Sequence, residues 1–180
     1  MKKIAALFSA IVFSIAAFAQ DGFRFDNPKK KKISISFKFI NNLIVVPVEV
    51  NGTQMNFLLD TGVDETILFS LDDQNEVKLN SIEKIKLKGL GGNEAVEGLK
   101  SSHNKMSFKG YSDPDHDIYI VLDQSFNFSA SIGIPVNGIL GYHFFKNNLV
   151  ELNYDQKRVI VHKSGQSRYP QENRPTVCGV

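Results

Sequence analysis

Residues 57–69, FLLDTGVDETILF, place one carboxylate, that of Asp60, between two apolar runs. Apolar runs of this kind are usually buried, and a buried carboxylate is rare unless another group pairs with it. Thr61 and Gly62 follow the acid, and a glycine there allows a tight turn in which backbone N–H groups approach the carboxylate. Asp60 is therefore either a turn residue that bonds to its own backbone or the centre of the protein's chemistry.

Segments on both sides of this stretch alternate apolar and polar residues with a period of two, which indicates β-strands. Asn51-Gly52 is a strong hairpin signal, so residues 53–59 are expected to run back from this turn and to end at Asp60. One short helix is expected at residues 141–146. Many short strands with frequent turns predict an all-β barrel or sandwich. The other expected strands are residues 33–39, 43–50, 82–88, 104–109, 118–122, 149–154 and 158–162.

The N-terminal residues carry the pattern of a secretory signal peptide. Residues 1–3 are a short basic start, residues 4–18 are apolar, and residues 17–19 fit the small-x-small cleavage pattern. A signal peptide over residues 1–19 predicts an exported protein, periplasmic or secreted, whose mature chain begins at Gln20. The apolar stretch is short for a membrane span, and an uncleaved membrane anchor is the alternative.

The rest of the chain is expected to form one domain between two polar ends. Its 180 residues and 42% hydrophobic content suit a single globular core. We expect a flexible basic arm at residues 20–32, the domain at residues 33–163, and a disordered tail at residues 164–180. The formal charge of +2 gives no indication of a nucleic-acid partner, and the single cysteine, Cys178, cannot form an internal disulfide.

An aspartate that activates water for attack on a peptide carbonyl needs a second carboxylate close by. Two carboxylates about 3 Å apart cannot both ionise, so they share one proton. The ionised partner takes a proton from water, and the protonated partner polarises the carbonyl group. The chain holds one Asp-Thr-Gly sequence, at residues 60–62, so a single copy would supply half of such a pair.

The sequence LLDTG at residues 58–62, with Asp64, Thr66, Ile67 and Leu68 after it, resembles the active-site loop of retropepsin-like aspartic proteases, which include the retroviral proteases. Further along the chain, GILG at residues 138–141 resembles the apolar-apolar-Gly element that lies beside the catalytic loop in this family. The glycine-dense turn at residues 89–93 falls between the two, where the family has its flap. The resemblance covers residues 33–162 and implies a closed β-barrel with a flap hairpin and one short C-terminal helix.

The resemblance also implies an activity and a set of site residues. The protein would be an aspartic-type endopeptidase, with no metal or cofactor, acting as a homodimer in which two copies of the loop meet on a two-fold axis. Its catalytic residues would be Asp60, Thr61 and Gly62. The residues expected to bind the peptide substrate are Asp64, Gly89, Leu90, Gly91, Gly92, Ile139, Leu140 and Gly141.

Two other functions stay open at this point. The chain could be a catalytically silent module that uses the same fold to bind extended peptides or to serve as a scaffold. It could also be a β-rich surface module for glycan or lipid, although the absence of tryptophan makes stacking on sugars less attractive. Loss of cleavage on changing Asp60 would separate the protease from both.

Some residues depart from the family pattern or suggest other chemistry. Val63 stands where the family more often has Ala or Ser, and His143 stands where bacterial and cellular relatives often have an acid. Residues 113–117, DPDHD, begin like a calcium loop, but its sixth position is Ile118 instead of Gly. We therefore expect a solvated turn there. The four histidines show no zinc-type spacing.

Overall fold

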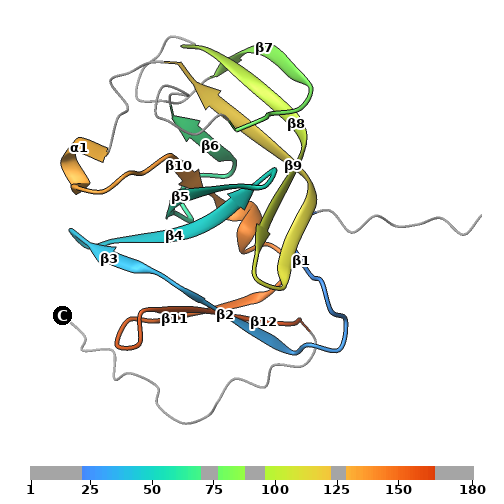
Figure 1. The fold of residues 1–180 in the computed structure, drawn as a ribbon, viewed down its shortest axis with the longest axis vertical. Coiled ribbons are helices and arrows are strands. Elements are labelled where there is room, and N and C mark those ends of the chain that lie inside the picture. The colour runs from blue at the N-terminus through green and yellow to red at the C-terminus, as the bar shows by residue number, and fades with distance from the viewer. Residues whose placement is uncertain (1–21, 70–76, 88–95, 123–128, 165–180) are drawn as a thin grey trace, which may run out of the picture.

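The computed structural model describes residues 22–69, 77–87, 96–122 and 129–164. Within these residues the chain is almost entirely β-structure, with one short α-helix and one 3-10 helix, which confirms the predicted all-β class (Figure 1). None of the helices in this part of the chain is long and apolar enough to cross a membrane. The elements are β1 (Arg24–Phe25), β2 (Lys32–Ser36), β3 (Lys38–Ile40), β4 (Leu43–Val50), β5 (Thr53–Leu59), β6 (Thr66–Phe69), β7 (Ile82–Leu87), β8 (Val96–Phe108), β9 (Tyr111–Val121), α1 (Ser129–Ile132), β10 (Gly138–Leu140), the 3-10 helix Tyr142–Phe144, β11 (Leu149–Asn153) and β12 (Arg158–His162).

The hairpin of β4 and β5 forms where the sequence predicts it. Asn51 and Gly52 make the turn with φ of 47° and 89°, a left-handed conformation that these two residue types tolerate best. The strands pair antiparallel from Val50↔Thr53 to Val45↔Leu58. This register places Asp60 directly after the last residue of β5.

Nine strands pair into one large sheet. Its order is β1-β9-β6-β10-β5-β4-β8-β7, with β3 on β4 and an additional pairing of β9 with β8. Six of the strands are thus linked in a ring, but β4 and β8 share only the pairs Glu49↔Ser107 and Val50↔Met106. The predicted closed barrel therefore stays a prediction, whereas the β-sheet architecture is confirmed.

The short strand β10 lies between β5 and β6 and joins the two sides of the Asp60 loop. It runs parallel to β5, with Leu140 beside Leu59, and antiparallel to β6, with Gly138 beside Leu68. A Cβ atom on Gly138 would collide with the carbonyl oxygen of Ile67. Glycine is therefore required at the start of β10 by the close approach of its neighbour.

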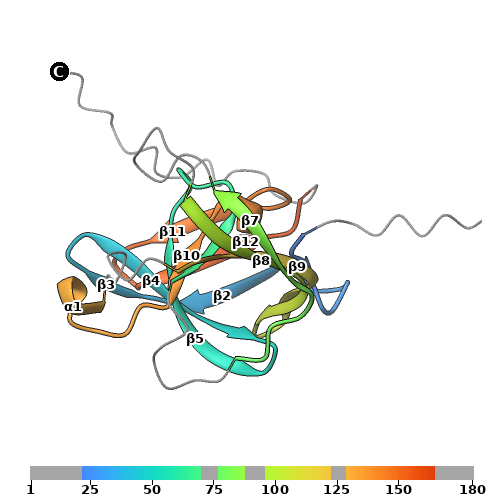
Figure 2. The same ribbon diagram turned by 90° about the horizontal axis from the view of Figure 1, so that it is seen from above.

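A smaller sheet of three strands, β11-β12-β2, pairs the C-terminal hairpin with the N-terminal strand. Ile33, Ile35, Val159 and Val161 point inward from it and are buried in the main core. Figure 2 shows α1 beside the hairpin of β3 and β4. There the Asn41 side-chain amide donates a hydrogen bond to the carbonyl oxygen of Ser131 at 3.3 Å.

The structure differs from the expected flexible arm at residues 20–32. From Gly22 onward the chain belongs to the fold, because Phe23 is buried and β1 pairs with β9. The Phe23 ring packs against Tyr111 and Phe144, with ring centroids 5.4 Å and 5.6 Å apart. A single aromatic residue before a run of lysines gave no periodic signal in the sequence. The predicted signal peptide, and the predicted tail beyond residue 164, lie outside the described residues.

The expected solvated turn at residues 113–117 is wrong. These residues lie within β9, which pairs with β8 through Met106↔Asp113 and Asn104↔His116. Asp113 and His116 are each only 3% exposed. Proline and three acids in five residues favour a turn by composition, but the pairing with β8 and the buried contact between Asp113 and His116 determine the strand.

Candidate active site

The Asp60 loop follows β5 and presents its carboxylate to solvent. Phe57 and Leu58 are buried as the apolar pattern predicts, but Asp60, Thr61 and Gly62 are exposed in the single chain. The Gly62 N–H donates to Asp60 Oδ1 at 2.8 Å, which fixes the direction of the carboxylate. The carboxylate is thus oriented by its own loop and remains accessible to a further partner.

The loop is attached to the end of β10 by two backbone hydrogen bonds. The Asp60 N–H donates to the Leu140 carbonyl oxygen at 3.1 Å, and the Tyr142 N–H donates to the Val63 carbonyl oxygen at 2.7 Å. A Cβ atom on Gly141 would collide with the carbonyl oxygens of Glu65 and Val63. The glycine that ends GILG is therefore needed for the loop to lie flat on β10.

The structure assigns supporting positions to part of the predicted substrate-binding set. Leu140 is fully buried and Gly141 is buried, so both hold the loop from beneath. Ile139 is half-buried and packs with Val63 and Val121 in a small cluster. Asp64 is exposed at the surface of the loop, where a ligand could reach it.

A chain of three buried polar side chains anchors the far end of the loop, and the sequence analysis did not find it. Thr66 Oγ1 lies 2.7 Å from His116 Nε2, and His116 Nδ1 lies 2.7 Å from Asp113 Oδ2. An ionised carboxylate only accepts hydrogen bonds, so a neutral His116 donates from Nδ1 and accepts the Thr66 hydroxyl at Nε2. We call this set the Thr66–His116–Asp113 chain. The sequence carries one trace of it: Asp113 and His116 stand three residues apart just before the strand expected at residues 118–122.

The Asp113 carboxyl responds to two opposing effects. Burial by itself raises its pKa, but the hydrogen bonds from His116 and from the Asp115 N–H help to offset this, and the pKa is held below its usual value of 3.8. Asp113 is therefore ionised over the range in which most proteins are stable. Its negative charge in turn favours the form of His116 that carries a proton on Nδ1 and accepts the Thr66 hydroxyl at Nε2.

A second histidine supports the loop from the 3-10 helix. His143 Nδ1 lies 3.5 Å from Glu65 Oε2, and the two side chains are each about one-third exposed. The rings of His143 and His116 meet edge-on with centroids 6.3 Å apart. The segment from Asp60 to Thr66 is thus held at β10, at the 3-10 helix and at β9.

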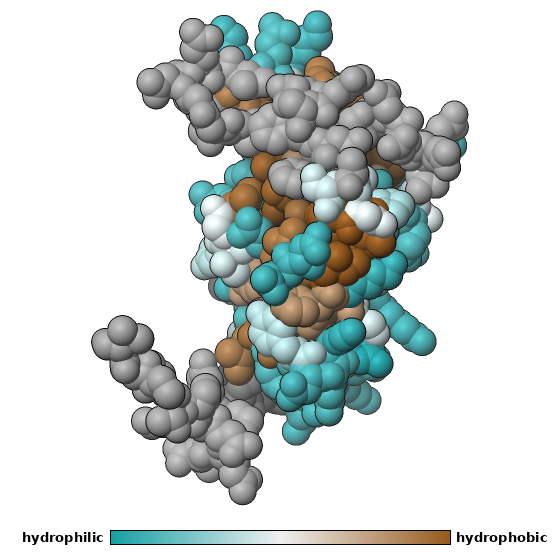
Figure 3. All heavy atoms as spheres, turned by 90° about the vertical axis from the view of Figure 1, so that its left-hand side faces the viewer, coloured by the Kyte–Doolittle hydropathy of each residue, from teal (hydrophilic) through white to brown (hydrophobic). Residues whose placement is uncertain are grey.

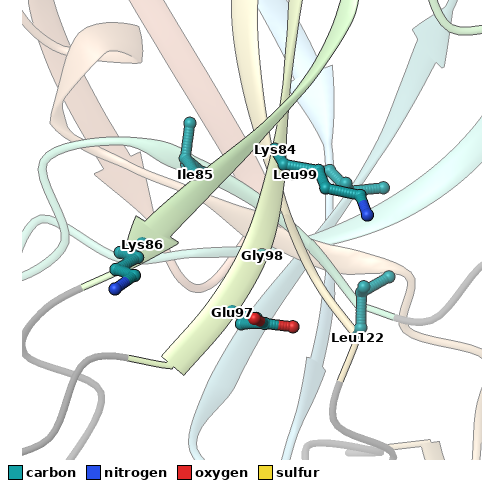
Figure 4. Close-up of a pocket in the computed structure, with 7 residues that line it drawn as sticks. All are labelled: Lys84, Ile85, Lys86, Glu97, Gly98, Leu99 and Leu122. Carbon is teal, nitrogen blue, oxygen red and sulfur yellow. The ribbon is translucent and has the colours of Figure 1, made fainter.

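The strands β7 and β8 form the hairpin in which the flap is expected. They pair antiparallel from Ile82↔Ser101 to Leu87↔Val96, and the predicted tip with Gly89, Leu90, Gly91 and Gly92 lies outside the described residues. A cavity of about 320 Å³ opens between this hairpin and the end of β9 (Figure 4). Asp60 is not among its lining residues, which are Lys84, Ile85, Lys86, Glu97, Gly98, Leu99 and Leu122.

Metal ligands do not gather in the described part of the chain. No three His, Cys, Asp or Glu side chains among these residues lie close enough to hold an ion. His116 and Asp113 use their polar atoms on each other and on Thr66.

An Asp-Thr-Gly loop held between two strands by a short crossing strand, with a hairpin after it, defines a protein of the aspartic-protease class. The sequence model of the family described as aspartyl protease matches residues 46–144, more than half of the chain. The chain therefore belongs to the aspartyl protease family. The matched range contains the Asp60 loop, the β7–β8 hairpin and GILG.

Solved structures were also compared. The crystal structure of a retropepsin-like aspartic protease from Rickettsia conorii superposes with a TM-score of 0.47 and 14% sequence identity. The match covers 73% of this chain and 90% of the other. Among curated proteins, no sequence matches the chain significantly.

Proposed function

We propose that this protein is an aspartic-type endopeptidase in which two copies of the chain each contribute Asp60 to one catalytic pair. The observation that carries the proposal is the Asp60 loop. Its carboxylate is exposed and oriented by Gly62, while its backbone is fixed to β10. A rigid support for an accessible acid is what general acid–base catalysis requires.

The chemistry follows from bringing two such carboxylates together. Each chain supplies one Asp60, so a two-fold axis through the loops would place the two acids side by side and let them share one proton. The ionised Asp60 would remove a proton from water as the oxygen attacks the peptide carbonyl. The protonated Asp60 would donate its hydrogen bond to the carbonyl oxygen, and then its proton would pass to the leaving amine. The pair would titrate as a unit.

The residues beside Asp60 have supporting parts in this proposal. Thr61 and Gly62 are exposed next to the acid, where a second copy of the loop could contact them. Asp64 is exposed two residues further on and would accept hydrogen bonds from the backbone of an extended peptide. The β7–β8 hairpin would cover that peptide. On the same proposal, the protein works outside the cytoplasm after export.

An apolar surface supports the second copy. Figure 3 shows a broad hydrophobic area on the side of the molecule where α1 and the β3–β4 hairpin lie in Figure 1. Phe39 at the end of this hairpin is 39% exposed and Leu43 is also 39% exposed. Tyr154 is 52% exposed and packs edge-on against Phe39, with ring centroids 5.4 Å apart. Contiguous apolar surface of this kind is typical of protein contacts.

The test is cleavage of an unfolded protein substrate by the mature protein, scanned from acidic to neutral pH. Asp60→Asn keeps the size of the side chain and the hydrogen bond from Gly62 but removes the ionisable group, so it should abolish cleavage. Asp155→Asn, in the exposed turn between β11 and β12, removes the same charge elsewhere and should cleave normally. Equal cleavage by the protein and by Asp60→Asn would refute the proposal.

A catalytically silent peptide-binding module is the second candidate. The hydrogen bond from Gly62 to Asp60 favours it, because the same bond is made by many turn aspartates that have no catalytic part. If the protein forms a dimer, folds like Asp60→Asn and cleaves nothing at any pH, this candidate is supported instead.

A further inference from the structure

A cluster of lysines occupies one end of the molecule, and the proposed peptidase activity makes no use of it. Lys29, Lys30, Lys31 and Lys32 lead into β2, Lys109 lies in the turn between β8 and β9, and Lys163 follows β12. We call these six residues the lysine end. The sequence alone showed only the run 29–32, whereas the fold adds Lys109 and Lys163 from distant parts of the chain.

Hydrogen bonds and a close approach place these segments side by side. The Lys163 N–H donates to the Lys31 carbonyl oxygen at 2.9 Å, and Lys163 Nζ donates to the Pro28 carbonyl oxygen at 2.8 Å. Lys30 Nζ would lie 3.3 Å from a Cβ atom on Gly110, the residue after Lys109. Figure 1 shows β2 and the turn of β8 and β9 meeting at this end, opposite the β7 hairpin.

Most lysines of the lysine end form no ion pair within the part of the chain that the structure describes. Lys29, Lys30, Lys31, Lys32 and Lys109 are exposed, and none of them forms a salt bridge with any residue that the structure describes. A neighbouring acid, Asp26, accepts a hydrogen bond from the Ser112 hydroxyl. The whole chain has a formal charge of +2, so without these six lysines its charge would be −4. The contacts between their segments make these six lysines a basic patch at one end of the molecule.

The N-terminal segment joins the fold at the same end. The Asp26 N–H donates to the Gly110 carbonyl oxygen at 3.2 Å, and Arg24 pairs with Ser112 in the first residues of β9. In the sequence, the apolar residues 4–18 end a few positions before Gly22. The apolar residues 4–18 thus lead, along the sequence, toward the lysine end.

We propose that the lysine end binds the surface of an anionic lipid bilayer and orients the domain with this end toward the membrane. Compact ammonium groups without exposed aromatic neighbours suit a diffuse layer of lipid phosphates. Binding to single-stranded nucleic acid would favour stacking aromatics and arginine. The exposed aromatic side chains of the described residues, Phe39, Tyr142 and Tyr154, belong to other segments.

The expected strength of membrane binding follows from the number of lysines. One lysine near an anionic membrane increases binding about five-fold, so four lysines together could change partitioning by a factor of hundreds. The attraction should weaken steeply as salt rises, because the Debye length falls from about 30 Å at 0.01 M to about 10 Å at 0.1 M.

The test is co-sedimentation of the exported protein, in the form in which the cell releases it, with vesicles of phosphatidylcholine containing about 30% phosphatidylglycerol. The variant replaces Lys29, Lys30, Lys31 and Lys109 by Gln and leaves Lys163 in place, since its ammonium group holds the Pro28 carbonyl. The matched control replaces four exposed lysines elsewhere by Gln: Lys38, Lys78, Lys84 and Lys86. Both variants lose the same charge.

The proposal expects the parent and the control to sediment with the anionic vesicles at low salt, and the variant to bind at least about ten-fold less. None of the three should depend on the anionic lipid at 0.5 M salt. Equal binding by the variant and the control would overturn the proposal. So would failure of the parent to bind these vesicles while it binds heparin, which would indicate a soluble polyanion. Neither outcome depends on peptidase activity.

Discussion

At the scale of single residues, the polar groups around the Asp60 loop determine how firmly it is held. Thr66, His116 and Asp113 are all nearly fully buried, so each must satisfy its hydrogen bonds within the protein. The chain of contacts links the residue that ends the loop to the middle of β9. It fixes the far end of the loop through Thr66, six residues after Asp60.

Replacing Thr66 by valine tests this support. Valine keeps the branched shape but leaves His116 Nε2 buried without a partner, which should cost about 1–3 kcal/mol of unfolding free energy. Thr66→Ser, which keeps the hydroxyl and loses one methyl group, is the matched control and should cost about 1 kcal/mol or less. Chemical denaturation measures both, and a Thr66→Val protein as stable as Thr66→Ser would mean that the hydroxyl contributes nothing.

Asp113 gives the fold a dependence on acid. Its pKa is lowered in the folded state, so its stabilisation is complete above the ordinary value of 3.8 and is lost as the pH falls through the lower folded value. Asp113→Asn has no carboxylate that could be protonated in this range. Unfolding free energies measured from pH 6 downward should therefore fall more steeply below pH 3.8 for the parent protein than for Asp113→Asn. Parallel curves would show that Asp113 is not the group responsible.

At the scale of elements, a glycine at the start of β10 and another directly after its end explain why a three-residue strand can organise the site. Gly138 and Gly141 lie where neighbouring backbone leaves no room for a side chain, and Leu140 between them is buried. The apolar-apolar-Gly pattern is therefore required by packing where β10 lies between β5 and β6. Its connection with the Asp60 loop is made by backbone hydrogen bonds.

Gly141→Ala should displace the Asp60 loop. The added methyl group meets the carbonyl oxygens of Glu65 and Val63, so the backbone must move, at a cost of about 1–3 kcal/mol. Hydrogen exchange at residues 60–66 should become faster. Gly52→Ala is the control, because a Cβ atom at Gly52 meets nothing within 4 Å and only its left-handed φ is strained. Unchanged exchange at residues 60–66 in Gly141→Ala would show that the loop does not need a glycine at this position.

Much of this architecture could be predicted from the sequence, for identifiable reasons. The Asn51-Gly52 turn, the alternation in β2 and β12, and the motif around Asp60 are local signals, and the structure has all of them. The 3-10 helix Tyr142–Phe144 lies within the helix expected at residues 141–146. These features depend on neighbours in the sequence.

The errors concern features that depend on distant partners. The strand at Asp113 and the burial of Phe23 exist because β8 and the aromatic core cover them, and neither partner is visible from a local window. The Thr66–His116–Asp113 chain joins residues 50 positions apart in the sequence. Tertiary contact therefore overrode local composition at each of these points.

At the scale of the whole molecule, the fold separates its surfaces. The Asp60 loop is exposed, an apolar surface includes Phe39, Leu43 and Tyr154, and the lysine end lies at the β8–β9 turn. The proposed function uses the first two surfaces in a symmetric pair, since one chain holds one Asp-Thr-Gly sequence.

The most direct test of the central claim is a mixing experiment. The parent protein is co-refolded with increasing amounts of Asp60→Asn, and cleavage is measured at constant parent concentration. If the active unit needs one Asp60 from each copy, random pairing with an equal amount of variant should roughly halve the rate, and a nine-fold excess should reduce it to about one-tenth. Asp155→Asn in place of Asp60→Asn should not suppress the rate. A parent rate that does not change with added Asp60→Asn would contradict the shared pair, because each chain would then act alone.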